Sequence, residues 1–415
     1  MTHEHIAGSA VSRGVDLELL ARLAQPAESR IVLWVLDGLG GLPVEAGGPT
    51  ELEAARTPHL DRLAAEGIAG LIEPVGPGIT PGSGPGHLAL FGYDPLKYEV
   101  GRGVLSALGI GVDLQAGDVA ARGNFCTVDE AGHVVDRRAG RIDSDVGRRL
   151  CEKLAEIELP GVQLDVRPVK EYRFVLRLRG EGLSGAVGDT DPQATGVPPS
   201  RAEALEAAAE RTADLVRTFL GRAAELLQDD DPANMALLRG FSTLPDWPRF
   251  PDVTGLRAAA LADYPMYRGV ARLLGMEVLE SEAGTEARID AAERHWADHD
   301  YFFLHEKPID AAGEDGDFDR RVDLIERIDA AVPRLLALEP DVLVVTGDHS
   351  TPARLKAHSW HPVPVLLHAA SARPDAVERF SERACIAGAL GPRLPAPALL
   401  PLALGHAGRL RKFGA

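Results

Sequence analysis

The segment Leu343-Val344-Val345-Thr346-Gly347-Asp348-His349-Ser350 joins an apolar, β-branched run to a carboxylate and an imidazole. Such a run is typical of a strand buried on both faces of a sheet. In open α/β sheets, ligands bind just beyond the carboxyl ends of the strands. An oxygen donor beside a nitrogen donor at this place suits a divalent metal ion. The same pair also occurs in helix caps and turns, so other strand ends must decide between these interpretations.

Two other predicted strands also lead into carboxylates. The unbroken apolar run Ile31-Val32-Leu33-Trp34-Val35-Leu36 ends in Asp37, which a flexible glycine turn follows. The run Tyr301-Phe302-Phe303-Leu304-His305 leads into a segment that contains Asp310 and Glu314. Because these two acids are four residues apart, one helical turn would place both on the same side. An isolated Asp-Gly pair is usually a turn, but the recurrence of carboxylates after predicted strands favours a shared site.

Glycines and prolines fill residues 74–86 so densely that we expect a loop without helix or strand. Ser83 lies between two glycines in this loop, just before His87. Backbone with small side chains can approach a phosphate closely and offer it N–H groups. The loop therefore predicts a serine nucleophile, and the alternative is a flexible surface loop with an incidental serine.

The chain of 415 residues exceeds one comfortable core, so we expect two domains. Residues 1 to about 28 are predicted to form a helical arm. Residues 112–228 are predicted to form a smaller α+β insertion, and residues 1–111 and 229–415 the core. Within the insertion, Ser200-Arg201-Ala202-Glu203 resembles a capping box that opens a helix to about Leu227. Residues 235–238 are predicted to return to a buried core strand.

Arginines gather in the predicted insertion although the whole chain carries a net charge of −18. Arg guanidinium groups bind carboxylate and phosphate through two parallel hydrogen bonds. A substrate site for an anion and a solvated charged turn are both compatible with this pattern. The residues concerned are Arg122, Arg137, Arg138, Arg141 and Arg173.

Composition excludes several classes of protein. The net charge of −18 argues against a general nucleic-acid-binding surface. No run approaches the roughly 18 apolar residues of a membrane helix, so no membrane partner is expected. Three scattered cysteines without a CxxC pair argue against a disulfide framework. Because the first residues also lack the pattern of a signal peptide, we predict a cytoplasmic protein.

The candidates combine into one kind of chemistry. Two metal ions about 3.5–4 Å apart can activate a serine hydroxyl and neutralise a phosphoryl group during in-line displacement. The candidate ligands are Asp37, Ser83, Asp310, Glu314, Asp348, His349 and His358, with Ser83 as the catalytic nucleophile.

Taken together, the motifs resemble cofactor-independent phosphoglycerate mutases of the archaeal type, within the alkaline phosphatase superfamily. The matching segments run in family order across nearly the whole chain. They are 36–38, 57–67, 82–83, 87–90, 92–95, 122–125, 136–141, 189–192, 267–269, 313–317, 347–350 and 358–359.

The resemblance implies an α/β fold, an alkaline-phosphatase-like doubly wound mixed sheet interrupted by the α+β insertion as a capping domain. It implies that Ser83 is phosphorylated while 3-phosphoglycerate and 2-phosphoglycerate interconvert, under a closed cap that excludes water. Asp37, Asp348 and His349 would hold one metal, and Asp310, Glu314 and His358 the other. Mn²⁺ is favoured over Zn²⁺, Mg²⁺ or Co²⁺. The expected partner is a small phosphorylated acid, and the oligomeric state stays open.

The resemblance also implies arginines that grip the substrate's carboxylate and phosphate. Arg137, Arg138 and Arg141 would come from the insertion, and Arg239 and Arg268 from the core side.

Three departures from the family pattern bear on this prediction. The family usually has His at the position of Glu314, Asp-Thr-Ala where this chain has Gly84-Pro85-Gly86, and often Lys at Arg268. A carboxylate at 314 shifts metal preference, and the altered loop removes a polar neighbour of Ser83. The alternatives are a metal-dependent phosphohydrolase, a mutase for another small phosphorylated or phosphonylated acid, and a degenerate relative that acts as a ligand-binding or scaffold protein.

Overall fold

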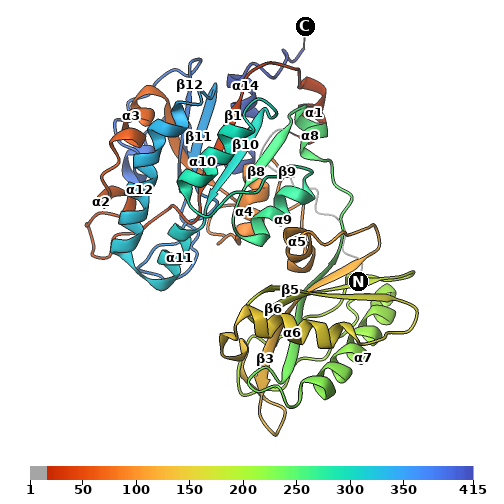
Figure 1. Ribbon diagram of the computed structural model, residues 1–415. Coiled ribbons are helices and arrows are strands. Elements are labelled where there is room, and N and C mark those ends of the chain that lie inside the picture. Colours follow the sequence, from red (N-terminus) through yellow and green to blue (C-terminus); the bar gives the residue numbers. More distant parts are fainter. Residues whose placement is uncertain (1–15, 415) are drawn as a thin grey trace, which may run out of the picture. The chain divides into compact units, whose positions relative to one another are not determined.

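The computed structural model describes residues 16–414, which form two compact units (Figure 1). Within this range the first unit contains residues up to Glu99, Pro248–Tyr264 and the chain from Leu274 onward. The second contains Val100–Trp247 and Pro265–Leu273. Among these residues, no helix is long and apolar enough to cross a membrane.

The first unit is built on an eight-stranded mixed sheet with strand order β13-β2-β12-β11-β1-β10-β8-β9. The central strands β11, β1, β10 and β8 are parallel, whereas β12 is antiparallel to both of its neighbours. The strands are β1 (Ile31–Leu36), β2 (Ile68–Glu73), β8 (Ala258–Leu261), β9 (Glu277–Val278), β10 (Tyr301–Glu306), β11 (Val342–Thr346), β12 (Val363–Ala369) and β13 (Gly391–Pro395). Strands β1 and β10 are buried along their whole length, as unbroken apolar runs predict.

Helices cover both faces of this sheet. Successive side chains of a strand point to opposite faces, so neighbouring residues of β10 show what packs on each face. Phe303 of β10 packs against His87 and Phe91 at α4, whereas its neighbour Phe302 stacks on Trp296 just after α10. The predicted doubly wound arrangement is therefore confirmed. The helices of this unit are α1 (Leu17–Leu23), α2 (Glu51–Ala54), α3 (Pro58–Glu66), α4 (Ser83–Leu90), α8 (Phe250–Thr254), α10 (Thr285–Arg294), α11 (Pro308–Asp315), α12 (Phe318–Leu336), α13 (Glu382–Cys385) and α14 (Leu399–His406).

The second unit has a five-stranded antiparallel sheet with helices on both sides. Helices α6 (Ser144–Ala155) and α7 (Glu210–Leu227) pack on one face, and α5 (Arg102–Gly109) and α9 (Pro265–Leu273) on the other. The strands are β3 (Val119–Val128), β4 (Val134–Asp136), β5 (Gln163–Lys170), β6 (Arg173–Arg179) and β7 (Met235–Thr243). This is the α+β texture that the sequence indicates.

The second unit extends beyond the predicted range of 112–228 at both ends. Strand β7 pairs with β3, with Arg239 opposite Arg122, so the strand that we assigned to the core belongs to the second sheet. Helix α5 contributes Val104 and Ala107 to a hydrophobic cluster of this unit. A buried apolar strand looks the same in either sheet, and this is why the sequence alone misplaced β7.

Three local predictions are wrong in part. The expected loop at 74–86 ends early, because α4 begins at Ser83. The proline at the third helical position is tolerated there, since a first-turn N–H has no helical partner. The expected helix at Ser200 begins only at a short turn from Ala207, because Ser200 and Leu205 donate to backbone oxygens at 190 and 186 instead. Of the predicted N-terminal arm, only α1 is helical among the described residues, and residues 1–15 lie outside them.

Candidate metal centre

Asp37 and Asp348 lie together because they follow neighbouring parallel strands. Strand β1 pairs with β11 in a register that places Val35 opposite Thr346. The carboxyl ends of the two strands therefore meet at one edge of the sheet, where α/β folds bind ligands. The Gly38 N–H donates to Asp348 Oδ1 at 3.3 Å, which joins the two turns directly.

Asp37, Asp348 and His349 form one candidate metal site, which we call the strand-end group. His349 Nε2 lies 3.3 Å from Asp37 Oδ1 and 3.2 Å from Asp348 Oδ2. All three side chains are fully buried. One ligand atom from each lies within 4.8 Å of the others, which is the spacing that a single cation could bridge. The predicted trio is thus brought together.

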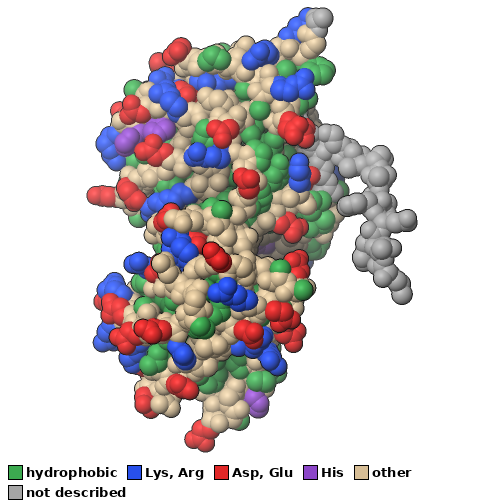
Figure 2. Space-filling model, turned by 90° about the vertical axis from the view of Figure 1, so that its right-hand side faces the viewer, with side chains coloured by type: hydrophobic (Ala, Val, Ile, Leu, Met, Phe, Trp, Pro, Cys, Tyr) green, Lys and Arg blue, Asp and Glu red, His purple; other side chains and the backbone are tan. Residues whose placement is uncertain are grey.

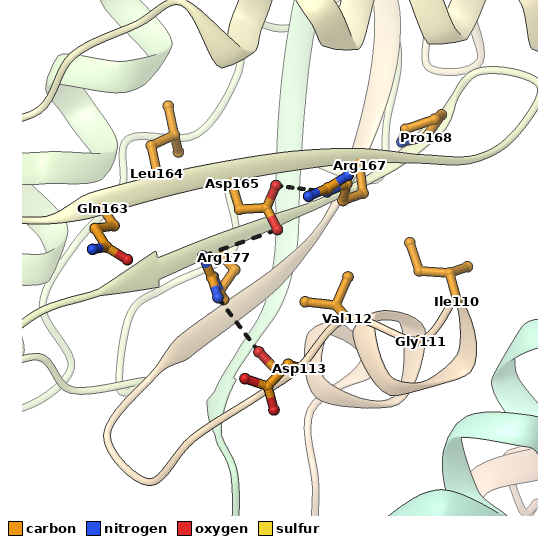
Figure 3. Close-up of a pocket in the computed structure, with 10 residues that line it drawn as sticks. All are labelled: Ile110, Gly111, Val112, Asp113, Gln163, Leu164, Asp165, Arg167, Pro168 and Arg177. Carbon is orange, nitrogen blue, oxygen red and sulfur yellow. Dashed lines mark hydrogen bonds and ion pairs between the residues drawn. The ribbon is translucent and has the colours of Figure 1, made fainter.

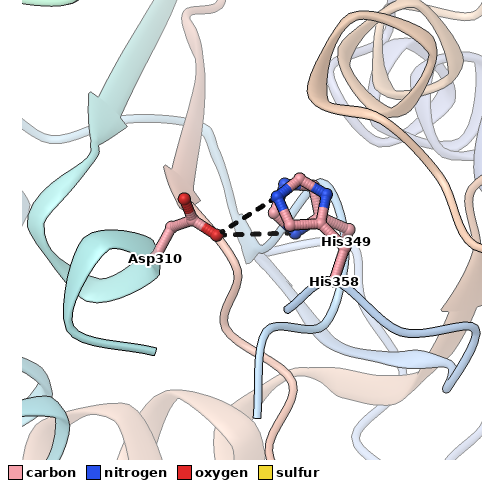
Figure 4. A group of neighbouring side chains, drawn as sticks. All are labelled: Asp310, His349 and His358. Atoms are coloured by element: carbon pink, nitrogen blue, oxygen red, sulfur yellow. Dashed lines mark ion pairs between the residues drawn. The ribbon is translucent and has the colours of Figure 1, made fainter. Parts of the chain in front are cut away.

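Asp310, His349 and His358 form a second candidate site, which we call the helix-side group because α11 supplies its carboxylate (Figure 4). Asp310 Oδ1 lies 3.9 Å from His349 Nδ1 and 3.6 Å from His358 Nε2. The two imidazole rings stack with their centroids 3.6 Å apart. His349 therefore belongs to both groups, a sharing that the sequence did not predict.

Two predicted ligands, Glu314 and Ser83, lie outside these groups. Glu314 lies one turn after Asp310 on α11, as predicted, and its Oε1 is 4.0 Å from His358 Nε2. Its side chain is 55% exposed, whereas Asp310 is buried. Glu314 thus stands at the solvent edge of the helix-side group.

Ser83 is the first residue of α4 and lies against the strand-end group. Its Oγ is 3.2 Å from His349 Nε2, the nitrogen that also faces Asp37 and Asp348. Gly86, one turn further along α4, allows this approach. A Cβ at Gly86 would lie 2.4 Å from the main-chain oxygen of Asp348. The glycine-rich segment therefore seats the serine by close packing of backbone on backbone.

The donor set fits divalent cations. Burial raises the pKa of Asp37, but Lys307 and His305 outweigh this and hold it well below its usual range. Burial raises the pKa of Asp348 well above its usual range, and the charge of Asp37 adds to this effect. Two adjacent buried carboxylates thus cannot both ionise without cost, and a dication would remove that cost. Burial lowers the pKa of His349, which favours the neutral imidazole that binds metal.

Three further residues of the site were not predicted. Lys307 lies between the groups, with Nζ 3.3 Å from Asp37 Oδ2 and bonded to Asp310 Oδ2. His305 Nε2 is 3.3 Å from Asp37 Oδ2, and burial lowers its pKa to about 4. His87 Nδ1 is 2.8 Å from the main-chain oxygen of Ser83. The sequence did carry signals, since β10 ends beside β1 and His87 follows Ser83 by one helical turn.

The predicted substrate arginines all lie in the second unit. Arg137 donates two hydrogen bonds of 2.8 Å to buried Asp191, and Arg239 reaches the same carboxylate at 3.5 Å. This placement corrects our assignment of two arginines to the core side, because β7 and α9 carry them into the second unit. The two are Arg239 and Arg268.

The remaining arginines of this unit differ in exposure. Arg138 and Arg141 are exposed on a turn after β4. Arg122 lies opposite Arg239 in the sheet, and Arg173 lies opposite Asn124 on β3. Since alternate residues of a strand share a face, Arg122 and Asn124 point to the same side of β3. The arginines of adjacent strands β3, β6 and β7 thus form a basic row that the sequence alone did not order.

The second unit also contains a cavity of about 920 Å³ (Figure 3). It lies between residues 110–113 after α5 and strands β5 and β6. Arg167 donates to Asp165 at 2.7 Å, and Arg177 donates to the main-chain oxygen of Asp113 at 3.4 Å. Arg177 Nη2 also lies 4.0 Å from Asp165 Oδ2, and the two arginines of the wall are matched by two aspartates, so its charges single out no class of ligand. The predicted site residues do not line it.

Comparison with known proteins identifies the family of the chain. A family model described as 2,3-bisphosphoglycerate-independent phosphoglycerate mutase matches residues 64–234. A probable mutase of that name from Thermus thermophilus is 54% identical over 402 residues, 96% of this chain and 99% of that protein. A solved structure from Pyrococcus horikoshii has a TM-score of 0.81 at 31% identity and covers 94% of this chain and 100% of that one. The cofactor-independent phosphoglycerate mutase of Thermoplasma acidophilum has a TM-score of 0.70 at 29% identity, with 92% and 100% covered. Similarity of this extent shows that the chain belongs to the 2,3-bisphosphoglycerate-independent phosphoglycerate mutase family.

Proposed function

We propose that this chain interconverts 3-phosphoglycerate and 2-phosphoglycerate through a phosphoserine at Ser83, with two divalent cations at the strand-end and helix-side groups. The observation that carries the proposal is the position of Ser83 Oγ, 3.2 Å from the imidazole that both groups share. A hydroxyl placed there has carboxylates and imidazoles on one side. The family to which the chain belongs supports this choice of substrate.

The reaction consists of two displacements at phosphorus. Ser83 Oγ bonds to phosphorus as the bond to the 3-oxygen of glycerate breaks, and the serine proton ends on that leaving oxygen. The 2-hydroxyl of the reoriented glycerate then bonds to phosphorus as the bond to Ser83 Oγ breaks, and the proton of that hydroxyl ends on Ser83 Oγ. Cations bound at the two groups would lower the pKa of the serine hydroxyl and offset the charge of the phosphoryl oxygens. Bare serine is a weak nucleophile at neutral pH, so this activation is required.

Lys307 is suited to organise the centre before cations bind. Burial lowers its pKa, but Asp37 and Asp310 raise it more, so the ammonium stays charged between one carboxylate of each group. A positive charge there attracts both carboxylates and keeps one on each side of Nζ. We propose this as a placement role, with the cations supplying the chemistry.

The arginines of the second unit are suited to hold the substrate's anionic ends. The Arg137 and Arg239 pair shares the single carboxylate of Asp191, so its guanidinium groups keep donors for a further anion. We assign the substrate grip to Arg137 and Arg239, with Arg138, Arg141 and Arg268 as further contributors. We propose that the second unit also acts as the cap, because exclusion of water separates a mutase from a phosphatase.

We propose Mn²⁺ as the preferred cation. The two groups together present carboxylate oxygens and imidazole nitrogens, with no thiolate among the described residues of the site. Carboxylate-rich sets suit Mn²⁺ and Mg²⁺, and imidazole extends the choice to Zn²⁺. Glu314 adds oxygen character at the edge of the helix-side group and so strengthens the case for Mn²⁺.

A direct assay tests the proposal. Purified protein with Mn²⁺ is given 3-phosphoglycerate, and both 2-phosphoglycerate and free phosphate are followed. Ser83→Ala is the test variant, and Ser371→Ala, at an exposed serine of the same unit, is its matched control. We expect 2-phosphoglycerate from the wild type and the control and none from Ser83→Ala.

Two outcomes would redirect the proposal. Phosphate release without the isomer would indicate a metal-dependent phosphohydrolase. No product of either kind would indicate another small phosphorylated or phosphonylated acid as substrate. The second outcome would fit the first residues of α4, because Gly84, Pro85 and Gly86 offer no polar side chain beside Ser83.

A further inference from the structure

A buried ion pair lies behind the two turns that carry the strand-end group. Arg321 of α12 and Glu51 of α2 are both fully buried, and Nη1 of the arginine donates to Oε1 of the glutamate at 2.8 Å. We propose that this pair, the Arg321–Glu51 brace, fixes the separation of the turn after β1 from the turn after β11. Arg321 and Glu51 are thereby positioning residues for the metal centre. The inference rests on the proposed metal centre, and it concerns residues that contact none of its ligands.

Arg321 reaches both turns at once. Its Nη2 donates to the main-chain oxygens of Gly38 at 2.6 Å and Leu39 at 3.1 Å, immediately after Asp37. Its Nη1 donates to the main-chain oxygen of Thr351 at 2.6 Å, two residues after His349. One planar guanidinium therefore ties together the backbones that carry the two halves of the strand-end group.

Glu51 completes the connection from the other side. Its Oε1 accepts from the Ala353 N–H at 2.8 Å, and its Oε2 accepts from the Leu42 N–H at 3.2 Å. Each carboxylate oxygen thus holds one of the same two turns. Because the carboxylate also neutralises Arg321, the pair contains its own counter-charge and adds no net charge beneath the metal groups.

Thr351 transmits this geometry to the ligands. Its Oγ1 donates to Asp310 Oδ1 at 2.6 Å and lies 3.0 Å from His349 Nδ1, so it contacts the helix-side group as well. Its backbone N–H donates to the main-chain oxygens of Gly38 and Gly40. Gly38 has a φ of +68°, and a Cβ there would lie 2.6 Å from Thr351 Oγ1. A small movement of Thr351 would therefore shift ligands of both groups.

The hydrogen-bonding geometry of arginine explains why a substitution at residue 321 would change the metal centre. Arginine presents donors in a rigid planar fork, whereas lysine has a single ammonium on a flexible stem. Lysine at 321 could keep the charge but could not hold the oxygens of Gly38, Leu39 and Thr351 together. Outer residues that orient metal ligands typically change metal affinity 10- to 100-fold when they are altered.

The test is Mn²⁺ titration of the folded full chain by calorimetry, without substrate. For Arg321→Lys we expect Mn²⁺ dissociation constants raised about 10- to 100-fold. The matched control is Arg409→Lys. Arg409 is equally buried in the same unit, but it bonds to Ser29 and Asp300, away from the site. The control should lower the melting temperature and leave Mn²⁺ affinity within about twofold.

A double variant separates positioning from stability. Glu51→Met combined with Arg321→Met removes both charges, and apolar replacement of a buried pair often restores stability that a single substitution loses. We expect the double variant to have a higher melting temperature than Arg321→Lys, while its Mn²⁺ affinity stays below that of the wild type. The double variant also provides a test of the brace if Arg321→Lys does not fold.

The outcomes distinguish the brace from the metal centre itself. If the wild type binds two Mn²⁺ ions and the folded brace variants bind them equally well, the positioning role is overturned and the proposed function stands. If the wild type binds no divalent cation, both are overturned. Reduced affinity in Arg409→Lys equal to that in Arg321→Lys would also reject the inference, because the effect would then follow stability alone.

Discussion

The strand-end and helix-side groups differ in how the chain supplies their ligands. Asp37, Asp348 and His349 follow adjacent parallel strands, and all are fully buried. In the helix-side group, Asp310 comes from α11 and His358 from a loop where its side chain is 22% exposed. Glu314 at its edge is 55% exposed. Strand ends thus place ligands rigidly and out of water, whereas helix and loop leave one side of the second group open to solvent.

This difference has an energetic consequence. The strand-end group brings two carboxylates together without solvent, so the apo protein carries a repulsion that a cation relieves. The open side of the helix-side group lets water screen charge. We therefore expect the strand-end group to decide whether the enzyme is active and the helix-side group to tune which metal it prefers.

The largest effect should come from removing one carboxylate of the strand-end group. Asp348→Asn is expected to lower kcat on the order of 10³-fold, because several kcal/mol of transition-state stabilisation depend on the cation. Glu314→Gln is the matched substitution at the open edge of the other group and should cost about tenfold or less. Steady-state assays with Mn²⁺ and 3-phosphoglycerate measure both. Equal losses would contradict the difference between the groups.

Glu382 shows what burial does to a carboxylate outside both groups. Burial raises its pKa to about 7, although Thr50 and the Gly41 N–H donate to it. The folded state then holds a proton that the unfolded state releases, so this contribution is complete below the unfolded pKa and is lost as pH rises through about 7. The glutamine side chain does not titrate, so Glu382→Gln should not show this loss. The free energy of unfolding of the variant minus that of the wild type should therefore rise from pH 5 to pH 8, by on the order of 2–3 kcal/mol. Urea unfolding at both pH values measures this difference, and a constant difference would contradict it.

Gly86 tests the close seat of α4 on the strand-end turn. A Cβ would lie 2.4 Å from the Asp348 oxygen, so Gly86→Ala should destabilise the protein by about 1–3 kcal/mol and lower kcat by moving Ser83. The matched control is Gly221→Ala in α7, where a Cβ meets no atom within 4 Å. Removing a helical glycine there should stabilise by roughly 0.5–1 kcal/mol. Thermal unfolding and mutase assays on both variants measure these effects. Equal changes in stability and in kcat for the two variants would contradict the packing argument.

The smallest expected effect is a change of metal preference at the open edge. Glu314→His replaces a carboxylate oxygen that lies 4.0 Å from His358 Nε2 with an imidazole nitrogen. Imidazole suits Zn²⁺ and Co²⁺ better than Mn²⁺. The ratio of the Zn²⁺ affinity to the Mn²⁺ affinity should therefore rise about tenfold in the variant. Competition calorimetry between the two ions measures this ratio. An unchanged ratio would mean that Glu314 takes no part in binding.

Much of the strand-end group could be predicted from the sequence. Unbroken apolar runs announce buried strands, and the residue after such a run lies where α/β sheets bind ligands. Helical spacing predicted that Asp310 and Glu314 lie on the same side of α11. The burial of Asp310 and the exposure of Glu314 depend on tertiary packing, which the sequence does not show. His305 and Lys307 could not be predicted from a pattern of carboxylates at strand ends, although β10 ends at the same edge of the sheet as β1.

The rest of the fold resisted prediction for physical reasons. The segment from Ser83 to Gly86 looks like a loop by composition, yet proline is compatible with a first helical turn, and close packing against Asp348 requires glycine at 86. Strand β7 is as apolar as a core strand, and only its pairing with β3 reveals its sheet. This pairing moved Arg239 from the core side to the second unit. Long-range pairing is not visible in local pattern.

The most direct test of the account is anomalous diffraction from crystals of the protein with Mn²⁺. We predict two anomalous peaks in the first unit. One should lie about 2.0–2.3 Å from ligand atoms of Asp37, Asp348 and His349, and the other at similar distances from Asp310 and His358. Ser83 Oγ should face the first peak. An absence of peaks at these residues, or peaks only elsewhere on the protein, would contradict the proposed two-metal centre.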